Sequence, residues 1–154
     1  MKKLASGNYL YSPSDLTTFM KSPFASWMAH AAKELPGLVA LKDKPDALMT
    51  SLQGKGYAHE ARFYDQIQTY NPSWRVIDIS KAVTDDNPDN QKSIALTIKA
   101  MKEGYDVIFQ GCLEQDGFRG FSDFLIKTPG ASNLGDYHYQ VWDTKLSKSV
   151  KPYF

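Results

Sequence analysis

The chain has a single cysteine and no long apolar run, and these two scarcities exclude several classes of protein. Cys112 alone cannot form an internal disulfide, a zinc site built from several cysteines or, within this chain, a four-cysteine iron–sulfur cluster. No apolar segment approaches the roughly 20 residues that span a bilayer, and the first residues lack the apolar stretch of a signal peptide. We therefore expect a cytoplasmic protein with no membrane partner, in which Cys112 is a small buried residue of a strand.

Net charge is also nearly absent, because 18 lysines and arginines offset 17 acidic residues and leave +1. The overall charge thus gives no sign of a polyanionic partner. The 154 residues, 42% hydrophobic and 23% charged, fit one folded domain and argue against disorder. Pro152 stands close to the end of the sequence, where it would suit the first turn of a further helix. We expect residues 1–154 to be a fragment of a longer protein with further domains.

Proline and serine mark two helix starts near the amino terminus. Ser12 is placed as the N-cap of a helix that begins at Pro13, and Asp15 is placed to reach back to the cap. Ser22-Pro23 repeats this start signal for a second helix. The pair Pro36-Gly37 then predicts a loop to about residue 45.

A longer helix is predicted from Asp46 to about Tyr70, because apolar residues recur there at steps of three and four. His59 lies on the predicted buried face of this helix. Gly54 and Gly56 weaken the first half, so either the helix starts later or the glycines let another segment pack closely.

The second half of the chain alternates between strand patterns and one helix pattern. Gly104 is the expected end of that helix, and Asp116-Gly117 is a hairpin signal between two strands. The predicted elements are strands at 74–79, 107–114, 118–126 and 139–146, a helix around 94–101, and a loop at 128–136. We therefore predict an α/β protein with a mixed β-sheet flanked by helices, the His59 helix packing against the sheet.

Two of the predicted strands carry charged residues that can meet. Successive side chains of a strand alternate between faces, so Asp143 and Lys145 share one face of the strand at 139–146. If the strand at 118–126 is its neighbour, Asp123 joins them. Two carboxylates and a lysine in one cleft are suited to Mg²⁺ or Mn²⁺, which prefer oxygen ligands. Tyr139, Val141 and Leu146 surround the pair with apolar residues, so the charges need each other or a cation; a structural Asp–Lys salt bridge is the alternative.

His59 and Glu60 are adjacent in sequence but differ in what the pattern predicts. A lone histidine on a buried face is more often a core residue than a ligand, although it would complete a set with Asp123 and Asp143. Glu60 is about 100° further round the helix. It could accept a hydrogen bond from a metal ligand, act as a ligand by way of water, or be a charge on the helix surface.

Three spaced motifs together resemble a known nuclease family. The order Gly56-x-x-His59-Glu60, Gly120-x-x-Asp123 and Asp143-x-Lys145 resembles the RecB-like branch of the PD-(D/E)XK nuclease superfamily, and residues 12–24 are similar to the amino-terminal motif of that branch. The resemblance implies a restriction-endonuclease-like fold over residues 1–154 and hydrolysis of DNA in repair, recombination or processing. It also implies that His59, Asp123, Asp143 and the Thr144 carbonyl hold Mg²⁺ or Mn²⁺. Lys145 would assist the attacking water, with Asp123 and Asp143 as the catalytic acids.

The sequence departs from this family pattern at two places. Ser22 stands where many relatives have the first cysteine of an iron–sulfur cluster, so we expect no such cluster. The chain ends before the Gln-x-x-x-Tyr helix that follows the Asp-x-Lys strand in the branch, which puts the activity of the fragment in question. A rival hypothesis is a non-catalytic nucleic-acid-binding or scaffold domain, in which Asp123, Asp143 and Lys145 form an ion-pair network. The sequence does not distinguish DNA from RNA as the partner.

Overall fold

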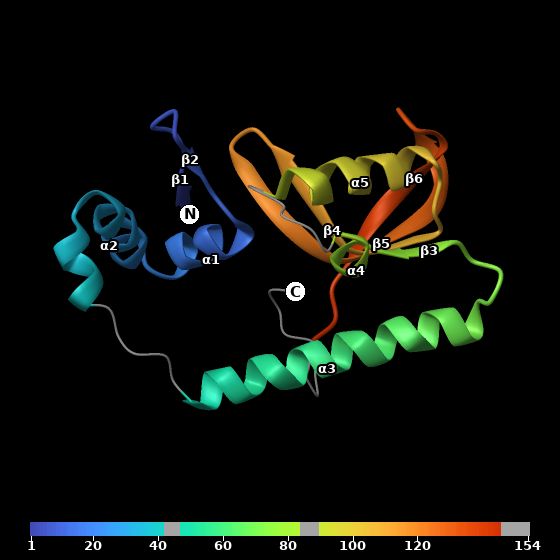
Figure 1. Cartoon of the computed structure of the whole chain (residues 1–154), viewed down its shortest axis with the longest axis horizontal. Coiled ribbons are helices and arrows are strands. Elements are labelled where there is room, and N and C mark those ends of the chain that lie inside the picture. The colour runs from blue at the N-terminus through green and yellow to red at the C-terminus, as the bar shows by residue number, and fades with distance from the viewer. Residues whose placement is uncertain (42–46, 84–89, 146–154) are drawn as a thin grey trace. The chain divides into compact units, whose positions relative to one another are not determined.

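The computed structural model describes residues 1–41, 47–83 and 90–145, and the chain divides into two compact units (Figure 1). The first, called the helical unit here, comprises Met1–Lys44 with Leu113–Gly120. The second, called the sheet unit, comprises Pro45–Cys112 with Phe121–Phe154. The sheet unit carries all the residues of the predicted metal site. No helix within the described residues is long and apolar enough to cross a lipid bilayer.

The helical unit confirms both predicted helix starts. Helix α1 (Pro13–Lys21) begins after Ser12, whose N–H donates to Asp15 Oδ2 at 2.8 Å. Helix α2 (Pro23–Glu34) begins after Ser22, whose hydroxyl accepts the Ala25 N–H at 3.1 Å. The unit also contains two short antiparallel strands and, where a loop was predicted from residue 36, a 3₁₀ helix; these elements are β1 (Lys2–Lys3), β2 (Tyr9–Leu10) and η1 (Pro36–Leu41). The rest of the predicted loop lies outside the described residues.

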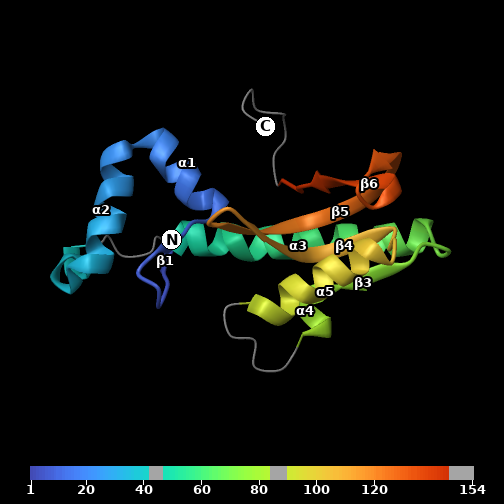
Figure 2. The same ribbon diagram turned by 90° about the horizontal axis from the view of Figure 1, so that it is seen from above.

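The sheet unit is a four-stranded mixed sheet flanked by helices, as predicted. The strands lie in the order β3-β4-β5-β6, with β3 parallel to β4 and β5 antiparallel to β6. Helices α3 and α5 lie on opposite sides of the sheet (Figure 1), and α3 runs beneath β4 and β5 (Figure 2). The elements are α3 (Ala47–Tyr70), β3 (Val76–Asp78), α4 (Ile79–Ala82), α5 (Gln91–Lys102), β4 (Val107–Gln115), β5 (Phe118–Ser132) and β6 (Gly135–Trp142).

Helix α3 is fixed to the sheet by its second half. Ile67 is buried in a core cluster with Phe124, and the Phe63 ring contacts the Phe124 ring edge-on with centroids 5.1 Å apart. The helix is continuous through Gly54 and Gly56, and a Cβ at either glycine would meet nothing within 4 Å. The helix therefore does not start later, and within the described residues nothing packs closely against these glycines.

Helix α5 covers the other face of the sheet. Thr97 is fully buried, and its hydroxyl accepts the Cys112 N–H from β4 at 3.0 Å. Cys112 is itself fully buried in the strand, which confirms its predicted role. Successive residues of β5 point to opposite faces of the sheet. Because α3 covers one face and α5 the other, Phe124 and Leu125 are both buried.

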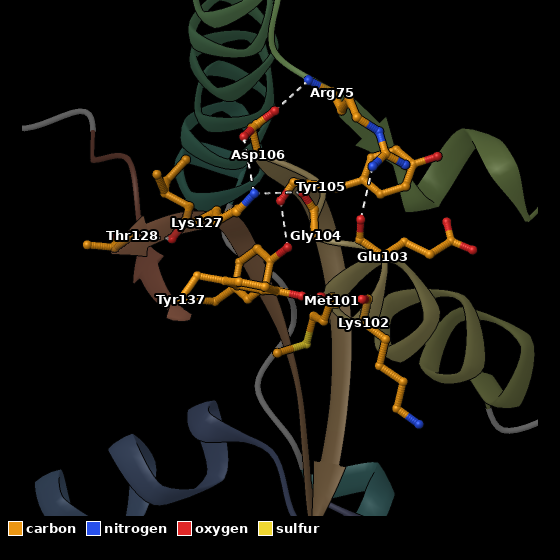
Figure 3. Close-up of polar contacts among 12 residues, drawn as sticks. Arg75, Met101, Lys102, Glu103, Gly104, Tyr105, Asp106, Lys127, Thr128 and Tyr137 are labelled. Atoms are coloured by element: carbon orange, nitrogen blue, oxygen red, sulfur yellow. Dashed lines mark hydrogen bonds and ion pairs between the residues drawn. The ribbon is translucent and has the colours of Figure 1, made fainter. Parts of the chain in front are cut away.

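The end of α5 is anchored by side chains from the sheet (Figure 3). A helix leaves its last carbonyls without partners inside the helix. Tyr137 from β6 donates to the Met101 carbonyl at 2.9 Å, and Lys127 from β5 donates to the Gly104 carbonyl at 3.2 Å. Arg75, next to β3, donates to the Glu103 carbonyl at 2.9 Å. Gly104 has the left-handed φ of 69° expected of a helix-ending glycine, which confirms that prediction.

The turn between β4 and β5 was predicted correctly, whereas the connection between β5 and β6 was not. Asp116 and Gly117 have φ values of 50° and 80°, as the predicted tight turn between β4 and β5 requires. The loop predicted at 128–136 is wrong, because β5 runs to Ser132 and β6 begins at Gly135. The pairing Thr128–His138 and Pro129–Tyr137 continues the ladder, and a register shift between Pro129 and Ser132 accommodates the proline.

Candidate metal site

Asp123 and Asp143 lie side by side at the end of the β5–β6 ladder. The antiparallel register pairs Phe124 of β5 with Trp142 of β6. Asp123 directly precedes Phe124 and Asp143 directly follows Trp142, so the two aspartates are the next residues beyond this pair. The carboxyl groups are near enough that hydrogen bonding between them raises the pKa of Asp123 and lowers that of Asp143. Strands β5 and β6 are neighbours, as predicted, and the two acids lie at the same end of the ladder.

The strand predicted at 139–146 is shorter than expected. Strand β6 ends at Trp142, so Asp143, Thr144 and Lys145 follow the strand, and Leu146 lies outside the described residues. The Thr144 N–H donates to Asp123 Oδ2 at 3.0 Å. The Thr144 N–H thus bonds to a side chain of β5 and not to a backbone carbonyl of that strand. The chain leaves the sheet at this point.

Lys145 is paired with Asp143, but in a less buried setting than the sequence indicated. Lys145 Nζ lies 2.5 Å from Asp143 Oδ2, and the two side chains are 52% and 48% exposed. Val141, expected to bury them, is 65% exposed on the edge strand. The two charges do pair with each other, which is one of the two alternatives predicted, but the prediction that apolar neighbours bury them is wrong.

Burial does act on Asp123. Burial and the hydrogen bond with Asp143 raise the pKa of Asp123 to about 6, against the opposing effect of the Thr144 N–H. Burial also opposes ionisation of Asp143, but the hydrogen bond with Asp123 and the ion pair with Lys145 lower its pKa overall. The two shifts are opposite in direction, so Asp123 is the carboxyl of the pair that takes up a proton first as the pH falls.

Replacing Asp123 with asparagine is expected to remove part of the pH dependence of stability. In the metal-free wild type, the raised pKa favours folding when Asp123 is protonated, and this contribution is lost as the pH rises from about 4 through 6. At pH 8 the variant should be more stable than the wild type by on the order of 1 kcal/mol, allowing for solvent screening of a partly exposed carboxyl. Urea unfolding in chelator at pH 4 and pH 8 measures this. Equal stability differences at the two pH values would contradict it.

Thr144 contributes a second unusual group. Its Oγ1 is buried and has no hydrogen-bond partner among residues 1–41, 47–83 and 90–145. Buried polar atoms nearly always have a partner, so an orphaned hydroxyl indicates a water, an ion or a ligand. The carbonyl oxygen of Thr144, predicted as a metal ligand, stays a prediction.

His59 and Glu60 are both half-buried on α3. Glu60 Oε2 accepts a hydrogen bond from Gln110 Nε2 at 3.1 Å. Burial and the charge of Asp143 raise the pKa of Glu60, while Lys145 and His59 lower it. Glu60 in turn contributes to the raised pKa of Asp123. Glu60 is thus the residue of α3 that interacts with both aspartates, which the sequence left open.

His59 is not brought into one group with the two aspartates. Across residues 1–41, 47–83 and 90–145, no set of three or more histidine, cysteine, aspartate or glutamate side chains is placed to hold one metal ion. Its role as a ligand stays a prediction.

Gln110 is a site residue that the sequence reasoning missed. It lies within β4 but has a φ of 53°, in the left-handed region that residues other than glycine rarely adopt. Gly111 follows, and a Cβ there would approach Leu125 Cδ1 to 3.0 Å. An isolated glycine inside a strand pattern is the signal that could have indicated this irregularity.

Comparisons of the chain with protein-family models, with curated proteins and with solved structures found no match. The chemistry of the site must therefore be inferred from its own residues.

Proposed function

We propose that the sheet unit is a metal-dependent nuclease domain of the restriction-endonuclease-like class, which hydrolyses DNA phosphodiester bonds with Mg²⁺ or Mn²⁺. The observation that carries this proposal is the pair of carboxyl groups on Asp123 and Asp143, with the Lys145 ammonium 2.5 Å from Asp143. A mixed sheet with helices on both sides agrees with this fold class.

The residues present fit a divalent ion. Burial is the main cause of the raised pKa of Asp123, followed by its hydrogen bonding with Asp143. Two neighbouring carboxyl groups also repel each other when both are ionised. A cation between them would relieve this repulsion. Carboxylate oxygens are ligands that Mg²⁺ and Mn²⁺ prefer, and both ions keep bound waters that could satisfy the orphaned Thr144 hydroxyl.

Asp123 and Asp143 would hold the ion, with the Thr144 carbonyl and His59 as further predicted ligands. A bound ion would neutralise phosphate charge and lower the pKa of a coordinated water. Lys145, kept beside Asp143, would donate hydrogen bonds to the attacking water or to a phosphate oxygen. Its exposure of 52% leaves the ammonium accessible to a polymeric substrate.

Metal-dependent cleavage of plasmid DNA, single-stranded DNA and RNA by the full-length protein tests the proposal. We expect cleavage with Mn²⁺ and none with chelator. The variant Asp123→Ala plus Asp143→Ala is the matched control, since any cleavage it retains comes from a contaminant. A well-folded wild type that cleaves none of these substrates would refute the nuclease proposal.

A non-catalytic nucleic-acid-binding or scaffold domain is the second candidate. The Lys145–Asp143 ion pair and the bond from Thr144 to Asp123 favour it, because together they tie the segment after β6 to β5 without any ion. In that case the site is a structural network, and the sheet unit keeps the fold without the chemistry.

A further inference from the structure

Four aromatic side chains of the helical unit lie in a continuous row. Tyr11 has ring neighbours on two sides, Phe118 at a centroid distance of 5.8 Å and Tyr9 at 6.4 Å. The Tyr9 ring also contacts the ring of His30 from α2, with centroids 4.3 Å apart. All four residues belong to the same compact unit. We call this series, Phe118, Tyr11, Tyr9 and His30, the aromatic row.

The backbone fixes part of the row before any ligand arrives. Leu10 is buried, and side chains alternate along an extended segment, so Tyr9 and Tyr11 share the opposite face. Tyr11 also forms a parallel β-bridge with Phe118, and the Arg119 N–H donates to the Tyr11 carbonyl at 2.8 Å. Rings held in this way lose little freedom when a ligand binds, which favours affinity.

The row is open to solvent, unlike the aromatic cluster of the sheet unit. Phe118 is 47% exposed and the other three rings are half-buried, whereas Phe124 is fully buried. Accessible aromatic rings can stack with nucleobases, because every base has a flat π-face. The bases must be outside a double helix for this, since those of a duplex already stack on each other.

The charge of the helical unit suits a polyanion. Lysines and arginines outnumber acidic residues there by seven to five, a net charge of +2, whereas the sheet unit has eleven against twelve. Phosphates are attracted to such an excess of positive charge. Glu34 accepts a hydrogen bond from the Tyr9 hydroxyl, but Lys3 Nζ lies 2.7 Å from Glu34 Oε2 and balances its charge. No uncompensated carboxylate thus acts on the row from this position.

We propose that the aromatic row is a stacking platform for single-stranded nucleic acid, which binds through its bases on the rings and its phosphates on the positive charge of the helical unit. This inference rests on the nucleic-acid substrate of the proposed function, but not on the metal site or on catalysis. A row that only packs α2 against β2 would affect stability and leave strand binding unchanged.

Fluorescence anisotropy of a labelled oligothymidylate with the full-length protein tests the inference, in chelator so that no metal-dependent cleavage occurs. Phe118→Leu removes the π-face and keeps an apolar side chain, while Phe118→Tyr keeps the ring. Tyr11→Leu removes a second ring of the row. Tyr70→Leu is the matched control, because it removes a ring that is 79% exposed on α3, outside the row. A DNA duplex is the second probe, and melting curves check that each variant is folded.

We expect affinity for the single strand to fall about 10-fold in Phe118→Leu and in Tyr11→Leu, and to stay unchanged in Phe118→Tyr and Tyr70→Leu. Duplex affinity should be the same in all of them. Wild-type affinity for the strand in folded Phe118→Leu would overturn the inference, as would an equal loss for the duplex. If Tyr11→Leu fails to fold, Phe118→Leu decides alone.

A wild type that does not bind the single strand would also overturn the inference. Mn²⁺-dependent cleavage of plasmid DNA, measured separately, shows whether the proposed function stands when the inference fails.

Discussion

Replacing Lys145 with alanine is expected to lower the rate of metal-dependent DNA cleavage by about 10²-fold or more, with Mn²⁺ affinity changed only slightly. An amine that orients or deprotonates the attacking water contributes a factor of this size. The ammonium is a donor and not a metal ligand, so its removal spares the ion's coordination. Asp143→Ala should lose both properties, because the carboxylate is a predicted ligand. Cleavage of plasmid DNA in Mn²⁺, paired with calorimetric titration, separates the two effects.

The structure determines which control this experiment needs. Lys145 and Asp143 are each about half exposed, so their ion pair contributes only about 0–1 kcal/mol to stability. Lys145→Ala should therefore melt close to the wild type whether the site is a nuclease centre or a structural ion-pair network. The rate of DNA cleavage distinguishes these two hypotheses, and a change in stability does not. Unchanged cleavage by the folded variant would contradict the role assigned to Lys145.

Adding Mn²⁺ at about 100 times its dissociation constant is expected to stabilise the wild type by about 2.7 kcal/mol, since a ligand that binds only the native state shifts the folding equilibrium. For a chain of this size that corresponds to a rise in Tm of roughly 5–10 °C. The physical source is the cost of keeping two ionised carboxyl groups close together in a partly buried place, and burial is the main reason that the pKa of Asp123 is raised to about 6.

Differential scanning calorimetry at pH 8, with Mn²⁺ and with chelator, measures this shift. Asp123→Ala plus Asp143→Ala should show no rise in Tm with metal. The same rise in that variant would place the ion elsewhere in the protein. Because protons compete for Asp123, the metal-induced rise should shrink as the pH falls below about 6.

Local sequence signals predicted the elements whose geometry depends on a few neighbouring residues. The helix starts at Pro13 and Pro23 follow from the capping serines before them. The hairpin at Asp116-Gly117 follows from the positive φ that those residues tolerate. The residues at which β5 ends and β6 begins and ends did not follow from local sequence signals. Strand β5 continued through Pro129 because the β6 ladder was there to pair with it, and pairing overrode the local loop signal.

The sequence by itself determined the mixed α/β class, the adjacency of Asp123 and Asp143, and the proximity of Lys145 to Asp143, because apolar runs and a short separation along the chain suffice for these. Tertiary structure alone decided that Glu60 interacts with the aspartates, because the rotation of α3 is set by Phe63 and Ile67 packing on Phe124. It also decided the left-handed backbone of Gln110 and the exposure of Lys145. These depend on how a strand is paired and covered, which periodicity along one segment does not encode.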